Sequence, residues 1–289
     1  MERFRTSLRA GGDDVRTALL DDLATYHGIS REEAVRRCRQ WEADSVEEWS
    51  EEDRDDEDAL LRFYRSTQSW GFDLVWFAYL QAEGFAEPTN VITVKWLNEH
   101  FHGGRRHLDF GSGAGAGAEA FLANGWTSTL ADVSSTLLDL AAFRLKRRGL
   151  DAGAVDLGVE SLPTGAFDAI TALDTITHVP DVHATALDLH RALADGGVLL
   201  ANFDVRPPSP ENAWHLYADD LMPRYHLESA GFRPIAGLPY GIVVYRRLPH
   251  GSTAHRLHRA YRWLTLASPL RRGARRLRLG VLRTAARFR

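Results

Sequence analysis

The stretch HLDFGSGAGAG, residues 107–117, decides the fold of this chain. It begins as a short apolar strand, reaches an acid at Asp109, and continues into three closely spaced glycines, Gly111, Gly113 and Gly115. Glycine lets the backbone turn tightly and approach a ligand, and the alanine-rich residues that follow favour a helix. A strand, a glycine turn and a helix in this order predict the first half of a nucleotide-binding βαβ unit.

The glycine spacing fits two kinds of nucleotide site. It satisfies the G-x-G-x-x-G/A pattern of a dinucleotide site, where a pyrophosphate sits at the helix N-terminus. However, the segment 126–135 predicts a second strand ending at Asp132, where a carboxylate can bond the ribose hydroxyls of an adenosine. Asp109 beneath the turn suits a ligand with an ammonium group and is unfavourable beneath two phosphates. The residues therefore predict a cationic ligand.

From this point the sequence resembles the class I S-adenosylmethionine-dependent methyltransferases, whose first motif is an acid followed by G-x-G-x-G. Asp109 and the three glycines match that motif in place. The segments that match further motifs, in family order, are 155–163 for the loop beside adenine, 167–181 for the fourth strand and the turn below the methyl group, 196–205 for the fifth strand, 228–234 for the last helix and its turn, and 240–247 for the closing antiparallel strand. The resemblance implies an α/β fold with a Rossmann-like, seven-stranded methyltransferase sheet.

The resemblance also implies a site for S-adenosyl-L-methionine. Asp109 and the glycine turn would hold the amino-acid part of this donor, and Asp132 its ribose. The alternatives are a hydrogen-bonded acid at a strand end for Asp109 and a helix N-cap for Asp132. Aromatic faces attract a sulfonium cation, so the N-terminal helices are expected to contribute as well. The residues expected around the donor are Asp109, Gly111, Gly113, Gly115, Asp132, Val133, Gly158, Val159, Glu160, Asp174, Tyr64 and Trp70.

Two positions depart from the family pattern. Where the family often has an Asp that accepts from the adenine amino group, this chain has Gly158, so that backbone groups of Gly158 and Val159 or the side chain of Glu160 would have to serve. In the turn after the fourth strand, many small-molecule methyltransferases have Glu before the His. Here Thr177 precedes His178, so a role for that Glu cannot be carried over.

The catalytic candidates follow the fourth strand. The family places this turn beside the transferring methyl group, and an imidazole titrates near neutrality, so His178 is the candidate base, with Asp174 also in the pocket. The alternative for His178 is a helix-start histidine bonded to backbone. The residues expected to contact the substrate are Trp76, His178, Trp214, His215 and Tyr217, although most aromatic residues at helical spacing are core, and an exposed loop position is the alternative for His215.

The composition fits a methyltransferase domain with accessory segments. The chain has 289 residues, 44% of them hydrophobic, and a net charge of −4. Three parts are expected: a helical lid and substrate module over 1–100, the donor-binding domain over 101–248, and a basic tail over 249–289. The single cysteine, Cys38, excludes a disulfide within the chain and favours a cytoplasmic setting. A cluster of Glu and His over 99–107 lacks a known metal spacing, so no metal site is predicted.

The basic tail allows several interpretations. It has no acidic residue and ends in RRGARRLRLGVLRTAARFR, residues 271–289, which predicts a basic amphipathic helix. A solvated helix docked on the catalytic domain and peripheral contact with an anionic membrane are equally open. Nucleic acid is a third interpretation, and no element for reading a base sequence is visible.

The sequence therefore predicts a methyltransferase that acts on a small or medium-sized molecule, with oxygen the acceptor atom by family frequency. One alternative is the same fold using the donor for aminocarboxypropyl transfer or intramolecular cyclisation, with release of methylthioadenosine. Another is an NAD-dependent oxidoreductase. A third is a catalytically silent binding protein that the basic tail recruits to membranes.

Overall fold

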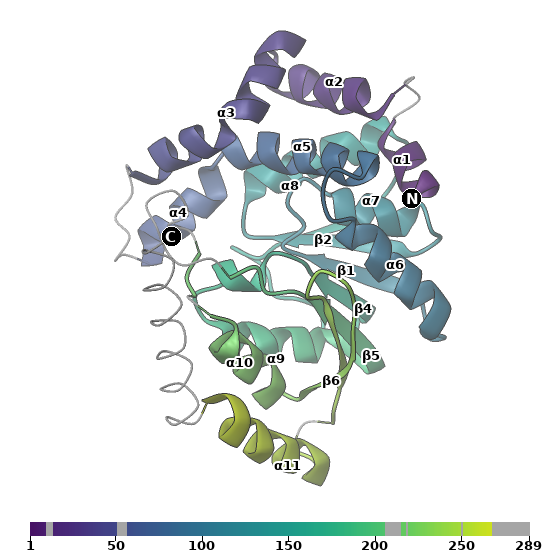
Figure 1. Cartoon of the computed structure of the whole chain (residues 1–289), viewed down its shortest axis with the longest axis vertical. Helices are drawn as coiled ribbons and strands as arrows, with labels where there is room; N and C mark the ends of the chain where they lie inside the picture. Colours follow the sequence, from purple (N-terminus) through teal and green to yellow (C-terminus); the bar gives the residue numbers. More distant parts are fainter. Residues whose placement is uncertain (10–13, 51–56, 206–214, 218, 250, 268–289) are drawn as a thin grey trace, which may run out of the picture.

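A seven-stranded sheet forms the centre of the molecule (Figure 1). The computed structural model describes all residues except 10–13, 51–56, 206–214, 218, 250 and 268–289. The strand order is β3-β2-β1-β4-β5-β7-β6, with only β7 antiparallel to its neighbours, which confirms the predicted methyltransferase sheet. The strands are β1 Arg106–Phe110, β2 Thr127–Asp132, β3 Gly153–Asp156, β4 Phe167–Ala172, β5 Leu193–Ala201, β6 Phe232–Gly237 and β7 Val243–Arg247.

Helices cover both faces of the sheet. The helices before the sheet are α1 Glu2–Leu8, α2 Val15–His27, α3 Arg31–Ser50, α4 Glu57–Ser66, α5 Ser69–Glu83 and α6 Thr89–His100. Those that follow β1 are α7 Ala116–Leu122, α8 Ser135–Arg147, the short turn η1 Ile176–His178, α9 Val182–Ala192, α10 Leu221–Ser229, α11 Thr253–Arg262 and the π-helical turn Trp263–Ala267. In the described residues no helix is both long enough and apolar enough to cross a bilayer.

The N-terminal helices share one core with the sheet. Phe4 of α1, Leu19 of α2 and Phe72 of α5 belong to the same buried cluster as Phe121 of α7 and Leu200 of β5. A second cluster fills the opposite face, between the sheet and helices α9 and α10. Every residue of β4 is buried, as expected for a central parallel strand covered on both sides. The helices that line the nucleotide end of the sheet are therefore held in place by the same core that holds the strands.

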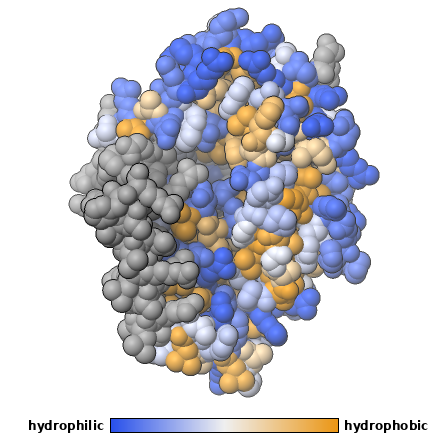
Figure 2. Space-filling view, in the orientation of Figure 1, coloured by the Kyte–Doolittle hydropathy of each residue, from blue (hydrophilic) through white to orange (hydrophobic). Residues whose placement is uncertain are grey.

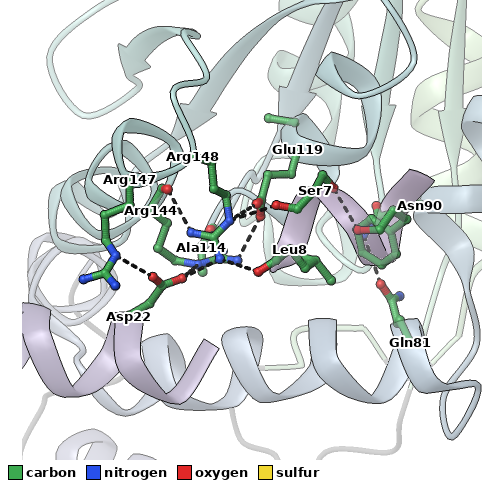
Figure 3. A network of polar contacts seen from close by, with 12 residues as sticks. Ser7, Leu8, Asp22, Gln81, Asn90, Ala114, Glu119, Arg144, Arg147 and Arg148 are labelled. Atoms are coloured by element: carbon green, nitrogen blue, oxygen red, sulfur yellow. Dashed lines mark hydrogen bonds and ion pairs between the residues drawn. The ribbon is translucent and has the colours of Figure 1, made fainter. Parts of the chain in front are cut away.

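A buried network of charges joins the N-terminal helices to the glycine turn (Figure 3). Arg144 on α8 donates to Asp22 of α2 at 3.3 Å and to Glu119 of α7 at 2.9 Å, and its guanidinium also donates to the carbonyl of Ala114 in the turn. Arg148 reaches the same Asp22 carboxylate at 2.7 Å and also pairs with Glu119. The side chains of all four charged residues are at most 2% exposed.

The network makes a sharp stability prediction for Asp22→Asn. The change leaves the buried arginines with too little negative charge, so we expect the free energy of unfolding to fall by about 3–5 kcal/mol. The control is the neighbouring Asp21→Asn, which breaks only a half-exposed pair with Arg31 and is expected to lower the free energy by at most about 1 kcal/mol. Urea unfolding of the two variants measures the difference, and equal losses would contradict the account.

Candidate functional site

A cleft of about 1290 Å³ opens at the carboxyl ends of β1, β2 and β4. This is the edge at which parallel α/β sheets bind their ligands. Its floor includes the glycine turn after β1, and one wall is formed by α4 and α5, which we call the lid helices. The volume exceeds that of a typical small-ligand pocket, which leaves room for two molecules side by side.

The glycine turn has a conformation and a packing that only glycine satisfies. Gly111 has a φ of +71° and Gly113 a φ of +49°, in the left-handed region that side chains disfavour. A β-carbon on Gly111 would lie 2.2 Å from the Thr175 side chain, and one on Gly113 would lie 2.6 Å from Leu74 of α5. Gly115, with a φ of +80°, is the N-cap of α7. The turn is thus held close to both the lid and the loop after β4.

Asp109 lies beneath the turn, as the sequence predicts. One carboxylate oxygen accepts from the backbone N–H of Ala118 in α7 at 2.9 Å, and the other accepts from the Thr171 hydroxyl of β4 at 3.1 Å. The residue is buried and lines the cleft. Burial is the main cause that raises the pKa of Asp109 to about 7, against the two hydrogen bonds that lower it. A nearby positive charge would lower this pKa again, so the site favours a cationic ligand.

Asp132 is the last residue of β2 and contacts the glycine turn. Its carboxylate accepts from the backbone N–H groups of Gly113 and Ser134, each at 2.9 Å. The N-cap of α8 is Ser134, whose hydroxyl accepts from the N–H of Leu137, so Asp132 is not the helix cap. Each carboxylate oxygen can accept a second hydrogen bond, and Asp132 lines the cleft, which leaves it able to bind a ribose hydroxyl.

The loop after β3 shows what occupies the space beside position 158. Arg65 of α4 forms a two-pronged pair with Asp156, with distances of 3.0 and 2.9 Å. A β-carbon on Gly158 would lie 1.8 Å from the Arg65 guanidinium, and the Gly158 N–H instead donates to Asp156 at 2.8 Å. Arg65 and Asp156 therefore tie a lid helix to the loop beside the expected adenine position. Sequence analysis missed both residues, because they are far apart in the chain.

The remaining donor-site candidates surround the same end of the cleft. Tyr64 and Trp70 of the lid helices, Val133 and Glu160 all line it. Tyr64 and Trp70 are in ring contact at 5.4 Å and pack with Val133. Val159 does not line the cleft and is 72% exposed. The backbone N–H of Glu160 donates to the carbonyl of Asp156 at 2.8 Å, and Glu160 lines the cleft.

Asp174 has an unusual backbone conformation where the chain leaves β4. It is a non-glycine residue with a φ of +53°, a state that Asp tolerates better than most residues. Its N–H donates to the side-chain carbonyl of Asn202 at 2.6 Å, and the Asn202 amide donates back to the Asp174 carboxylate at 2.5 Å. Asn202 follows β5 and is buried. This reciprocal pair fixes the Asp174 carboxylate at the edge of the cleft, and sequence analysis did not single out Asn202.

The substrate candidates divide into two groups. His178 and His215 both line the cleft, with ring centres 4.7 Å apart, and Trp70 lies 6.3 Å from the His178 ring. Tyr217 instead donates its hydroxyl to the carbonyls of Val179 and Pro180, each at 2.9 Å, behind the turn that carries His178. Trp76 packs against the N-terminal core and Tyr79, outside the residues that line the cleft. Trp214 lies outside the described residues.

The cleft is lined by many acidic side chains and lacks basic Lys and Arg side chains among its described residues. The acids that line it are Asp73, Glu87, Asp109, Asp132, Glu160, Asp174, Asp181, Asp188 and Asp204. Such a lining attracts cations and repels phosphates. Within the described part of the chain, no group of three or more His, Cys, Asp or Glu side chains is arranged to hold a metal ion.

Comparison with known families agrees with this geometry. Residues 108–199 match the family model described as a methyltransferase domain. The match begins in β1 and ends in β5, and so includes the glycine turn, Asp132 and the turn after β4. Residues 108–199 are therefore a domain of the class I S-adenosylmethionine-dependent methyltransferase type.

Several curated proteins are similar to this chain over the same domain. The chain is 30% identical over 112 residues to the ubiquinone biosynthesis O-methyltransferase of Azotobacter vinelandii, over 37% of this chain and 48% of that protein. It is 31% identical over 96 residues to the protein of the same name from Stutzerimonas stutzeri, over 32% of this chain and 41% of that protein. The chain thus spans about half the length of the curated relatives it matches.

Solved structures resemble it at low identity. One is the phosphoethanolamine N-methyltransferase 2 of Haemonchus contortus in complex with S-adenosyl-L-methionine, with a TM-score of 0.47, 20% identity, and coverage of 60% of this chain and 44% of that chain. Another is the Burkholderia thailandensis 1,6-didemethyltoxoflavin-N1-methyltransferase, with a TM-score of 0.44, 20% identity, and coverage of 60% and 86%. No residue role follows from likenesses at this level.

The residues of the cleft fit the cofactor of this domain family. S-adenosyl-L-methionine carries a sulfonium and an ammonium group, which match the acidic lining of the cleft. The hydroxyls of Tyr64 and Ser112 are buried, belong to residues that line the cleft, and have no hydrogen-bond partner among the described residues. Buried polar groups normally have a partner, so these two hydroxyls fit a ligand with polar edges.

The raised pKa of Asp109 predicts how stability depends on pH. The folded chain holds this proton more tightly than the unfolded chain, where the pKa is near 3.8. The stability that the proton confers is complete below about pH 4 and is lost as pH rises through about 7. Asp109→Asn has no carboxyl group to ionise at this position, so the variant does not lose this stability as pH rises. The free energy of unfolding of the variant, relative to the parent, should therefore rise between about pH 4 and 7, by up to about 4 kcal/mol.

Asp168→Asn provides a control of opposite sign. Hydrogen bonds from Arg106 lower the pKa of Asp168, so its carboxylate stabilises the fold above its ordinary pKa and loses this effect as pH falls. The Asp168→Asn variant should be the less stable protein at neutral pH, by a margin that shrinks in acid. Urea unfolding across the pH range measures both, and a pH-independent difference for Asp109→Asn would contradict the raised pKa.

Proposed function

We propose that this methyltransferase transfers the methyl group of S-adenosyl-L-methionine to a small or medium-sized molecule, with oxygen as the acceptor atom. The observation that carries the proposal is the glycine turn set between Asp109 and Asp132 in a cleft whose described lining has acids and no Lys or Arg. The choice of oxygen is supported by the names of the relatives from Azotobacter vinelandii and Stutzerimonas stutzeri, which are O-methyltransferases.

The proposed roles of the side chains follow from their positions. The glycine turn and Asp109 hold the amino-acid part of the donor, and Asp132 holds its ribose through the oxygen lone pairs that its backbone bonds leave available. When bound, the donor supplies an electrophilic methyl group on a positively charged sulfur. Tyr64 and Trp70 line the cleft, where their aromatic rings stabilise the cationic donor and exclude water.

Proton removal is assigned to the turn after β4. As the acceptor oxygen forms its new bond to carbon, its proton has to leave, and an imidazole nitrogen of His178 can take it near neutral pH. The Asp174 carboxylate, fixed by Asn202, stands at the same edge of the cleft and orients the acceptor hydroxyl. The bond between sulfur and carbon breaks in the same step and its electron pair stays on sulfur, so neither a covalent enzyme intermediate nor an oxidant or reductant is needed.

Donor binding is tested by calorimetry with S-adenosylhomocysteine and NAD. We expect S-adenosylhomocysteine to bind and NAD to give no measurable heat, because the described lining repels a pyrophosphate. Asp132→Ala should weaken S-adenosylhomocysteine binding by about 1–3 kcal/mol, the range for losing a hydrogen bond to a charged partner. Asp139→Ala, on the exposed side of α8, is the control and should bind as the parent does. Tight NAD binding without a response to S-adenosylhomocysteine would overturn the proposal.

Turnover is tested with a panel of phenols and catechols, with products identified by mass spectrometry. We expect a methyl ether together with S-adenosylhomocysteine, whereas methylthioadenosine would support the alternative donor chemistry. His178→Ala should lower turnover by about 10²–10⁴-fold, with S-adenosylhomocysteine affinity unchanged, if this imidazole removes the proton. His183→Ala, an exposed histidine of α9, serves as the control. Unchanged turnover in His178→Ala would remove this residue from the mechanism, and a panel without any methyl ether would contradict oxygen as the acceptor.

A further inference from the structure

Helix α11 is fastened to the protein by one face. His255 and His258 contact the carbonyls of Ser229 and Phe232 through their ring nitrogens, at 2.8 and 3.2 Å. Arg262 donates to the carboxylate of Glu228 at 2.6 Å. These residues are three and four positions apart, so they share one side of the helix, and that side packs on the end of α10 and the start of β6.

The other face of α11 carries large apolar side chains into solvent. Leu257 is 67% exposed, Tyr261 58% and Trp263, in the turn after the helix, 47%. Leu257 and Tyr261 are one turn apart and lie away from the fastened side. α11 is at the lower end of the molecule in Figure 1, and Figure 2 shows apolar side chains exposed at that end. We call Arg256, Leu257, Arg259, Tyr261 and Trp263 the outer face of α11.

The positive charge near the outer face of α11 indicates the kind of partner that this surface binds. Arg256 and Arg259 are also exposed, on the flank of α11 between its fastened side and Leu257. The sequence from 249 to 289 has no acidic residue, and eight further arginines lie between 271 and 289. A second copy of the same face would bring like charges together, which disfavours a symmetric dimer through α11. Duplex nucleic acid uses the arginines but not the exposed apolar side chains, and a single strand stacks on Tyr and Trp but gives no reason for an exposed Leu257. A lipid surface uses all of these side chains.

We propose that the outer face of α11 is a docking surface for an anionic lipid membrane. The apolar side chains enter the boundary between headgroups and acyl chains, where Trp and Tyr are favoured, and the arginines pair with lipid phosphates. The inference is independent of the proposed methyl transfer, since α11 lies outside the residues that line the cleft. The protein is held at the surface as a peripheral protein, with its catalytic domain on the aqueous side.

The test is sedimentation of the full chain with phosphatidylcholine vesicles, with and without phosphatidylglycerol. We expect binding only when the anionic lipid is present, and weaker binding as salt is raised. The double variant Leu257→Ser with Tyr261→Ser should lower the partition coefficient at least about tenfold, because both apolar contacts are lost. Phe85→Ser is the matched control: Phe85 is 74% exposed, lies after α5, and its loss should leave binding unchanged.

A second pair of substitutions tests the charges separately. Arg256→Gln with Arg259→Gln should weaken binding to anionic vesicles and reduce its dependence on salt. S-adenosylhomocysteine affinity, measured on each variant, reports whether the fold is intact. The proposal is overturned if the full chain ignores anionic vesicles, if the apolar double variant binds them as the parent does, or if the parent self-associates without lipid and this variant does not. Binding to duplex DNA in place of vesicles would also contradict it.

Discussion

Two almost fully buried arginines constrain much of this structure. Arg144 of α8 and Arg148, which follows the last residue of that helix, extend between the N-terminal helices and the glycine turn, where their side chains are at most 2% exposed. Charges in such a place have to be paired and fully hydrogen-bonded, since desolvation otherwise outweighs any gain. Asp22 from α2 and Glu119 from α7 supply the pairing, and backbone carbonyls of Ser7, Leu8 and Ala114 supply the rest. The arrangement exists only when α1, α2, α7 and α8 are all in place.

The consequence of this constraint reaches the donor site. The Ala114 carbonyl that receives Arg144 belongs to the glycine turn itself, so the turn and the N-terminal helices are parts of one polar network. On the other side of the cleft, Arg65 of α4 holds the loop after β3 through Asp156. The N-terminal helices are thus connected to both sides of the expected donor position, α2 through the buried charges and α4 through Arg65. A lid fixed in this way favours a pre-formed cleft over one assembled by the ligand, which lowers the entropic cost of binding.

Much of the fold and part of the site were predictable because they depend on residues that are close in sequence. A strand, an acid, three glycines and a helix specify the turn locally, and the same reasoning located Asp132 at the end of the next strand. Asp109 was expected as a partner for an ammonium group. Its partners in the structure are Ala118 and Thr171, and a residue as distant as Thr171 cannot be found by motif spacing.

The remaining site residues depend on packing between distant segments. Arg65 and Asp156 are 91 positions apart, and Arg144 and Asp22 are 122 apart. Position 158 shows this dependence on packing. The glycine there suggested that a side-chain contact to adenine is lost, and in the structure the Arg65 guanidinium occupies the space beside it. Tyr217 was expected to meet the substrate because it lies in the segment after the fifth strand, whereas its hydroxyl donates to the backbone beside His178. Sequence pattern specifies which element a residue joins, and packing specifies what its side chain contacts.

The central claim is that a single cleft, built by the glycine turn and closed by helices anchored to it, receives a positively charged sulfur nucleoside. A crystal structure of the full chain with S-adenosylhomocysteine tests it most directly. The account predicts the ribose at Asp132, the amino-acid part at the glycine turn, and α4 and α5 in their present positions with the pair between Arg65 and Asp156 intact. A nucleoside bound elsewhere, or a complex in which the Arg65 pair is broken and α4 has moved away from β3, would contradict it.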